Sequence, residues 1–186
     1  MLLITNVTAV TVDAQRRIVT DAAILVEDER IAEIGKTADL VARHPGVEQL
    51  DGRGMLALPG LIDAHAHSDQ ALLRGAADDL PWQPFLQEVI WPLLGQRTPE
   101  DALIGLKLCM LEMIKSGTTC FVEPNFSKRY NLDAMAEAVV DMGMRAVLAK
   151  FVLPQLEFEW RESEDDKGLI ETEEDSLADA ERGIQT

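Results

Sequence analysis

The sequence predicts an α/β protein with a small, all-β first part and a parallel α/β second part. Residues 1–58 contain short apolar and β-branched runs that are separated by turn residues, which is typical of strands and hairpins. After Pro59-Gly60, strand patterns alternate with helical patterns and the links are short. These two observations place a boundary between residues 58 and 59 and predict about three βα repeats after it.

The first part is built from short strands. Leu2–Val12 is rich in β-branched residues and predicts a strand, which the run Asp13-Ala-Gln-Arg16 ends. Four further apolar runs follow, at residues 23–26, 30–34, 47–50 and 55–58. The first two flank a short acidic turn and predict a hairpin. The last two flank Asp51-Gly-Arg-Gly54 and suggest a second hairpin.

The second part begins with a short apolar run, Leu61–Ala66, that ends in polar residues and predicts a buried parallel strand. Thr98-Pro-Glu-Asp101 predicts a helix start, because it offers an N-cap Thr, Pro at the first helical position and acidic residues in the first turn. Ser116-Gly117 predicts the end of that helix. The remaining expected elements are a strand over 118–122, a helix over 132–142, a strand over 145–152 and the start of a helix over 176–183.

Three parallel strands do not close a barrel, whereas a complete (β/α)8 barrel takes roughly 250 residues. At 186 residues the chain is therefore expected to be the front part of a longer fold, which further sequence or a companion chain completes.

Composition and charge exclude several classes of partner. The net charge of −16 argues against nucleic acid and anionic membrane surfaces, because both would repel the chain. Twelve acidic residues against three basic ones lie between Glu157 and Arg182, where we expect a solvated surface. The sequence has no apolar run long enough to span a bilayer, no leader pattern and only two cysteines, without paired spacing. A cytoplasmic location is the expectation.

His65 and His67 are the residues most indicative of chemistry. Along a strand, Asp63, His65 and His67 point to one face, with the two imidazoles roughly 6–7 Å apart. They can bind one ion if the strand end curls, and imidazole nitrogen suits zinc, iron or nickel. The alternative is that both are ordinary polar residues at a strand end.

The run Leu58-Pro-Gly-Leu-Ile-Asp-Ala-His-Ala-His67, with its lead-in over 51–58, resembles the entry to the barrel of the amidohydrolase superfamily. The further run Gln70–Leu80 is similar to the cytosine deaminase-like branch, which holds S-adenosylhomocysteine and methylthioadenosine deaminases and the s-triazine chlorohydrolases and aminohydrolases. The resemblance implies part of a β-sandwich (composite) domain over 1–58. It also implies the first three βα units of a metal-dependent hydrolase TIM barrel over 59–186.

The resemblance further implies one divalent metal, with zinc favoured and iron the alternative. In that branch the ligands are two His on strand one, a His on each of strands five and six, and an Asp on strand eight; a Glu after the strand-five His moves protons. Metal-activated water attacks a ring carbon, and ammonia, an amine or chloride leaves. Here only His65 and His67 match, and no His follows them. We therefore expect no catalytic residue in this chain, and no activity from it alone unless a second chain completes the site.

Three residues are predicted substrate contacts. Phe85 matches the position of a base-stacking Trp and keeps an aromatic face, whereas Leu94 matches that of a ribose-binding Glu and offers no acceptor. This favours a ribose-free N-heterocycle such as a triazine over an adenosine derivative, which stays an alternative. On the family layout Glu123 faces the barrel mouth, where it either touches substrate or caps a loop.

Two other interpretations stay open. The chain could be a non-catalytic truncated product or assembly half, as the missing ligands suggest. It could also be related to dinuclear enzymes such as dihydroorotases, against which the run Leu72-Leu-Arg-Gly75 argues. The expected partners of the complete protein are a small heterocyclic substrate, the remainder of the barrel and further copies of itself, with no nucleic acid or membrane.

Overall fold

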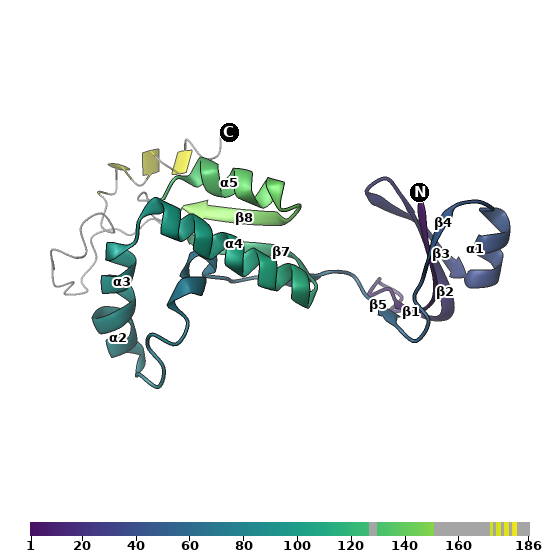
Figure 1. Cartoon of the computed structure of the whole chain (residues 1–186), viewed down its shortest axis with the longest axis horizontal. Coiled ribbons are helices and arrows are strands. Elements are labelled where there is room, and N and C mark those ends of the chain that lie inside the picture. The colour runs from purple at the N-terminus through teal and green to yellow at the C-terminus, as the bar shows by residue number, and fades with distance from the viewer. Residues whose placement is uncertain (127–129, 151–171, 173, 176, 179, 182–186) are drawn as a thin grey trace. The chain divides into compact units, whose positions relative to one another are not determined.

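The computed structural model describes residues 1–126, 130–150, 172, 174–175, 177–178 and 180–181. The chain divides into two compact units, Met1–Pro59 and Gly60–Thr186 (Figure 1). Three predictions concern residues that lie wholly or partly outside the described ones. They are the acidic segment that starts at Glu157, the helix expected over 176–183 and the last two residues of the strand expected over 145–152. Within the described part of the chain, no helix is both long and apolar enough to cross a membrane.

The first unit is a five-stranded sheet in the order β3-β2-β1-β4, with β5 also paired to β1. Strands β1 (Leu2–Val10), β2 (Ile18–Glu27) and β3 (Arg30–Lys36) are antiparallel neighbours, which confirms the predicted hairpin over 23–34. All described strands of this unit belong to one sheet. In place of the two packed sheets of the sandwich expected over 1–58, the structure has a single sheet and one helix there.

The second predicted hairpin is wrong. Strands β4 (Glu48–Asp51) and β5 (Leu56–Ala57) do not pair with each other; both run parallel to β1. The reason is that helix α1 (Thr37–Arg43) carries the chain back along the sheet, so that β4 starts in the same direction as β1. The Gly52 amide then donates to the Thr5 carbonyl at 2.8 Å, and β5 continues along the same edge of β1.

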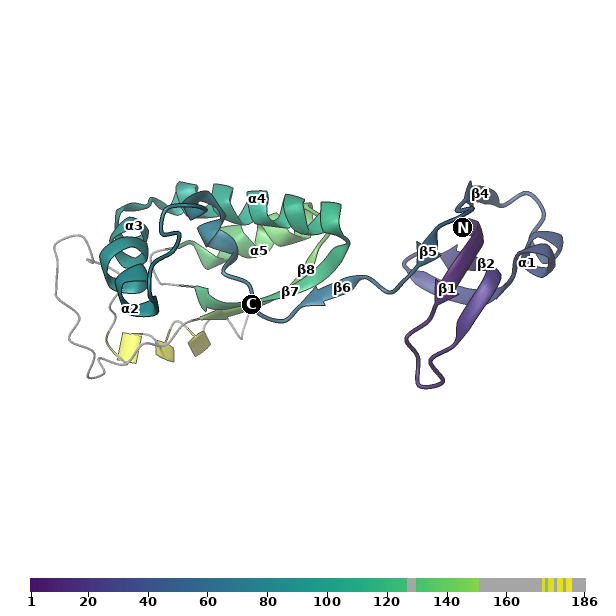
Figure 2. The same cartoon turned by 90° about the horizontal axis from the view of Figure 1, so that it is seen from below.

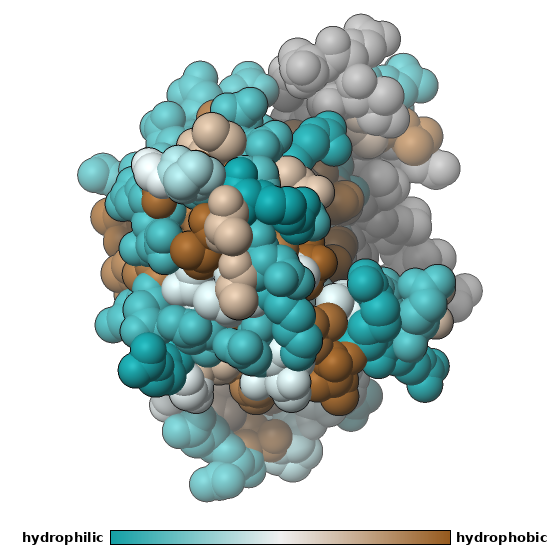
Figure 3. Space-filling view, turned by 90° about the vertical axis from the view of Figure 1, so that its right-hand side faces the viewer, coloured by the Kyte–Doolittle hydropathy of each residue, from teal (hydrophilic) through white to brown (hydrophobic). Residues whose placement is uncertain are grey.

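This unit has one core cluster between the sheet and α1 and a second among strand residues that include Val7 and Ala22. Leu40 of α1 is fully buried and packs with Leu3, Ala23 and Leu25 of β1 and β2. Other large apolar side chains stay exposed, among them Val12. The space-filling view in Figure 3 shows such apolar patches among mainly hydrophilic side chains on one face of the molecule.

The second unit is built on a parallel three-stranded sheet in the order β6-β7-β8 (Figure 2). The strands are β6 (Leu61–Asp63), β7 (Thr118–Phe126) and β8 (Arg145–Lys150). Helix α4 (Pro99–Ser116) leads into β7, and α5 (Leu132–Asp141) connects β7 to β8. The mixed α/β architecture predicted from the alternating pattern is therefore present.

Helix α4 begins and ends where its local sequence predicts. The Thr98 hydroxyl accepts the Asp101 amide at 3.1 Å, and the Asp101 carboxylate accepts the Thr98 amide at 2.9 Å, which forms a reciprocal cap. Gly117 ends the helix with a φ of +89°, a conformation that favours glycine. The buried face of α4 packs on β7 and α5 through a cluster that includes Leu106 and Phe121, both fully buried.

Between β6 and α4 the chain forms short helical segments that the sequence analysis did not predict. They are the 3-10 helix η1 (Ser68–Leu73), α2 (Trp82–Pro84), the π-helical η2 (Phe85–Ile90) and α3 (Trp91–Gln96). Of these, η1 directly follows the two candidate metal ligands and packs against α4.

Candidate metal centre

The chain turns out of β6 immediately before the two histidines. The strand ends at Asp63, three residues earlier than expected, and the Asp63 carboxylate accepts the His65 backbone amide at 3.2 Å. The Ala66 amide then donates to the Val122 carbonyl of β7 at 2.9 Å. This curled segment stays attached to the sheet, so the two imidazoles are not spread along an extended strand.

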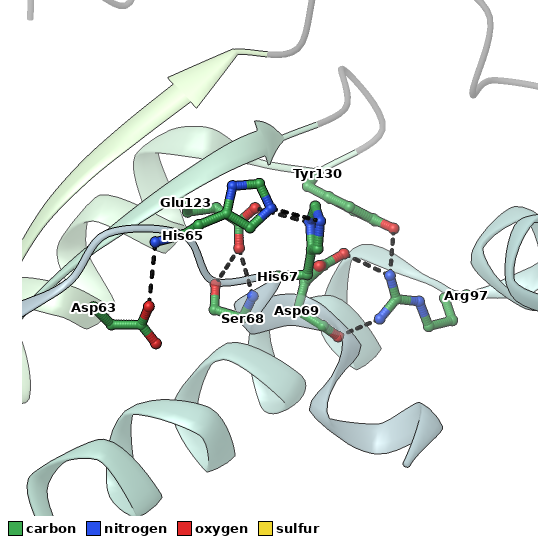
Figure 4. A network of polar contacts seen from close by, with 8 residues as sticks. All are labelled: Asp63, His65, His67, Ser68, Asp69, Arg97, Glu123 and Tyr130. Carbon is green, nitrogen blue, oxygen red and sulfur yellow. Dashed lines mark hydrogen bonds and ion pairs between the residues drawn. The ribbon is translucent and has the colours of Figure 1, made fainter. Parts of the chain in front are cut away.

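The imidazoles of His65 and His67 converge through their Nε2 atoms, which lie 3.3 Å apart (Figure 4). Their ring planes are nearly perpendicular, at 89°, with centroids 4.9 Å apart. Two nitrogens that each lie about 2.0–2.1 Å from a tetrahedral zinc ion are roughly 3.3–3.4 Å from each other. The observed separation therefore matches one edge of a zinc coordination tetrahedron. Without metal, it also allows one imidazole to donate a hydrogen bond to the other.

His67 is favoured in its neutral form. Its partial burial lowers the pKa of the imidazole, and the neighbouring His65 lowers it further. A neutral imidazole keeps a lone pair, which a metal ligand requires.

Glu123 lies next to His67 in the interior. It is fully buried, and its Oε2 atom accepts the backbone amide and the hydroxyl of Ser68 at 2.5 and 2.6 Å. Its Oε1 atom lies 3.8 Å from Nδ1 of His67. The carboxylate has no exposed surface in this structure, and its contact with substrate stays a prediction. The loop-capping alternative describes its hydrogen bonds.

Arg97 forms a second buried network that the sequence analysis missed. Its guanidinium donates to the Asp69 carboxylate at 2.6 Å, to the Asp69 carbonyl, and to the Tyr130 hydroxyl at 2.7 Å (Figure 4). Arg97 thereby joins the segments that follow β6, precede α4 and follow β7. Burial, together with the negative charge of Asp69, raises the pKa of Tyr130 to about 12, so the phenol stays protonated.

No local signal indicated this network. Its members are separated by 28 and 33 residues along the chain, and neither spacing corresponds to a helix or strand period.

The other two predicted substrate contacts lie outside the polar network of Figure 4. Phe85 opens η2 and is half-buried. Leu94 lies in α3 with 7% of its surface exposed, and its contact with substrate stays a prediction. Among residues with described positions, no third His, Cys, Asp or Glu joins the histidine pair in a group that could hold a metal ion.

Sequence comparisons match both units to known families. The model described as "Amidohydrolase family" matches residues 56–185, and that described as "Imidazolonepropionase-like composite domain, bacteria" matches residues 22–46. The chain is 42% identical over 151 residues to a 5-methylthioadenosine/S-adenosylhomocysteine deaminase of Halothermothrix orenii, which covers 80% of this chain and 34% of that protein. It is 38% identical over 174 residues to the deaminase of the same name from Desulforamulus reducens, covering 93% and 38%.

Solved structures give a consistent result. A mutant atrazine chlorohydrolase from Arthrobacter aurescens TC1, complexed with zinc and atraton, matches with a TM-score of 0.82 and 27% identity over all of this chain and 43% of that one. An adenosine deaminase from Xanthomonas campestris with bound zinc matches with a TM-score of 0.71 and 27% identity, over 97% and 38%. This chain spans 34% and 38% of the two curated relatives named above. With more than half of its residues matched by the family model, the chain belongs to the amidohydrolase family.

Proposed function

We propose that this chain supplies two ligands, His65 and His67, to a divalent metal site in a hydrolase that deaminates or dechlorinates an N-heterocycle. The observation that carries the proposal is the 3.3 Å separation of the two Nε2 atoms, which suits two ligands of one tetrahedral zinc ion. Zinc is favoured over iron because related structures were solved with zinc.

A divalent metal held by this pair would lower the pKa of water toward 7 and so supply a nucleophile at neutral pH. The turn at Asp63 makes the two imidazoles converge, and the partial burial of His67 lowers the pKa of that imidazole, which favours its neutral form. Two imidazoles fill only two of four zinc positions. The remaining ligands therefore come from outside this histidine pair, and we assign them to a companion part of the barrel.

The domain assignment is part of the same proposal. Residues 1–58 form part of the composite β domain, and residues 59–186 form the start of the barrel, with β6, β7 and β8 as its first three strands. The parallel order β6-β7-β8, with α4 and α5 as the connections, supports it.

The favoured substrate is a ribose-free ring, because Leu94 offers no acceptor for ribose hydroxyls. An adenosine derivative is the second candidate, supported by curated relatives that are named as adenosine-compound deaminases. Both are tested on the chain in its complete natural assembly, by following the release of ammonia and chloride from adenosine compounds and from aminated and chlorinated triazines. Turnover of adenosine compounds alone would contradict the preference drawn from Leu94.

Metal binding is tested on the full chain by competition for Zn²⁺ with a chromophoric chelator. We expect His65→Ala and His67→Ala each to weaken zinc binding at least tenfold. His44→Ala is the matched control, because His44 is the third histidine of the chain and lies at the end of α1 in the first unit. Equal zinc affinity in all three variants would overturn the proposal.

A further inference from the structure

The two oxygens of the Glu123 carboxylate have different surroundings. Oε2 is held by two donors of Ser68, the backbone amide at 2.5 Å and the hydroxyl at 2.6 Å. Oε1 faces Nδ1 of His67 at 3.8 Å. Because two directional hydrogen bonds restrain Oε2, the carboxylate cannot turn freely, and its second oxygen stays beside the His67 ring (Figure 4).

We propose that Glu123 is a positioning residue that keeps the proton of neutral His67 on Nδ1 and so leaves the Nε2 lone pair free for the metal. This inference rests on the proposed function of His65 and His67. It goes beyond that function, because it assigns a fully buried residue on a different strand to the selection of one tautomer.

The physical reason is that a neutral imidazole carries one proton on either of its two nitrogens, and the partner of one nitrogen decides which. A carboxylate oxygen near Nδ1 attracts an N–H there and repels a lone pair. In the buried surroundings of Glu123 this preference is stronger than it would be in water. Histidines that bind metals commonly have such a carboxylate behind the nitrogen that does not bind.

The contact between His65 and His67 fits the same tautomer. With the His67 proton on Nδ1, its Nε2 accepts a hydrogen bond, and Nε2 of His65 is the donor at 3.3 Å. In the metal-free chain we therefore expect His65 to carry its proton on Nε2 and His67 to carry its proton on Nδ1.

Glu123→Gln tests the assignment, because the structure dictates how the amide must sit. Both Ser68 donors require an acceptor, so the Gln oxygen takes the place of Oε2. The amide NH₂ then faces Nδ1 of His67, donates to it and moves the proton to Nε2. The change is nearly isosteric, and it reverses the tautomer instead of only weakening a preference.

The matched control is Glu112→Gln, which makes the same chemical change at an exposed carboxylate of α4 that pairs with Arg74. It removes one negative charge from the same unit without touching the histidine pair. Because the chain has three histidines, His67→Ala identifies the His67 signals in a spectrum.

Two measurements are made on the full chain at pH 8. Long-range ¹H–¹⁵N NMR of the metal-free protein reports the tautomer of His67, and competition with a chromophoric chelator reports zinc affinity. We expect the Nδ1–H tautomer in the wild type and in Glu112→Gln, and the Nε2–H tautomer in Glu123→Gln. Zinc affinity is expected to fall about 10- to 100-fold in Glu123→Gln and to stay unchanged in the control.

An Nε2–H tautomer of His67 in the wild type would overturn the proposal, and this measurement stands even if Glu123→Gln fails to fold. An unchanged tautomer and zinc affinity in a folded Glu123→Gln would overturn it as well. If the wild type shows the Nδ1–H tautomer but binds no zinc, the proposed metal function fails while the effect of Glu123 on His67 holds.

Discussion

Replacing Gly105 by Ala tests how closely α4 packs on the segment that follows the candidate metal ligands. Gly105 lies in the interior of the helix and is buried. A Cβ added there would overlap the carbonyl oxygen of Asp69 and lie 3.1 Å from its carbonyl carbon. Because Asp69 follows His67 by two residues, the packing of α4 supports the position of that histidine.

The magnitude follows from two opposing effects. In a helix interior, Ala is more favourable than Gly by about 1 kcal/mol. Overpacking a rigid site costs about 1–3 kcal/mol, and here the neighbouring group is backbone, which cannot rotate away as a side chain can. We therefore expect Gly105→Ala to lower the free energy of unfolding by about 1 kcal/mol. If no atom lay close to the added Cβ, the same substitution would raise that free energy by about 1 kcal/mol.

The assay is urea unfolding followed by tryptophan fluorescence. All three tryptophans, Trp82, Trp91 and Trp160, follow Gly60 in the sequence, so the signal reports on the second unit. Lys107, which is exposed on the same helix, supplies the control pair Lys107→Gly and Lys107→Ala. At that position Ala should be the more stable variant. If Gly105→Ala also stabilised the protein, the close contact with Asp69 would be refuted.

Three further predictions concern the same unit. Arg97→Met should lower the free energy of unfolding by about 3–5 kcal/mol, because it leaves the buried Asp69 carboxylate without its cation. Urea unfolding measures this loss, and a loss below about 1 kcal/mol would contradict a buried ion pair. Thr98→Ala should cost about 1 kcal/mol through loss of the reciprocal cap, and Thr98→Ser should retain most of it, as thermal melts will show. For Tyr130, the folded pKa of about 12 exceeds the ordinary tyrosine pKa of 10.0, so the phenol of the unfolded chain loses its proton first and stability falls as pH rises from 10 to 12. Tyr130→Phe should show a smaller loss between pH 8 and 11 by urea unfolding, and an equal loss would place the phenol in solvent.

Local sequence signals predicted those features that depend on neighbouring residues. Thr98 and Asp101 cap α4 through bonds within one helical turn, and Gly117 ends the helix because of its own backbone conformation. The β-branched runs predicted β1 and its hairpin neighbours in the same way. The prediction failed for residues 47–58, because the pairing of β4 and β5 with β1 depends on the path through α1, which no local pattern encodes.

For the candidate site, the sequence by itself predicted that His65 and His67 form a pair of metal ligands where the first strand of the second unit ends. Only the tertiary structure decided how they are held. The turn at Asp63 brings the Nε2 atoms to 3.3 Å, and Glu123 reaches Ser68 across 55 positions in the chain. Arg97 joins Asp69 and Tyr130 over separations of 28 and 33 positions. Such contacts depend on how β6, β7 and α4 pack together, because residues that are distant in sequence meet only when their elements do.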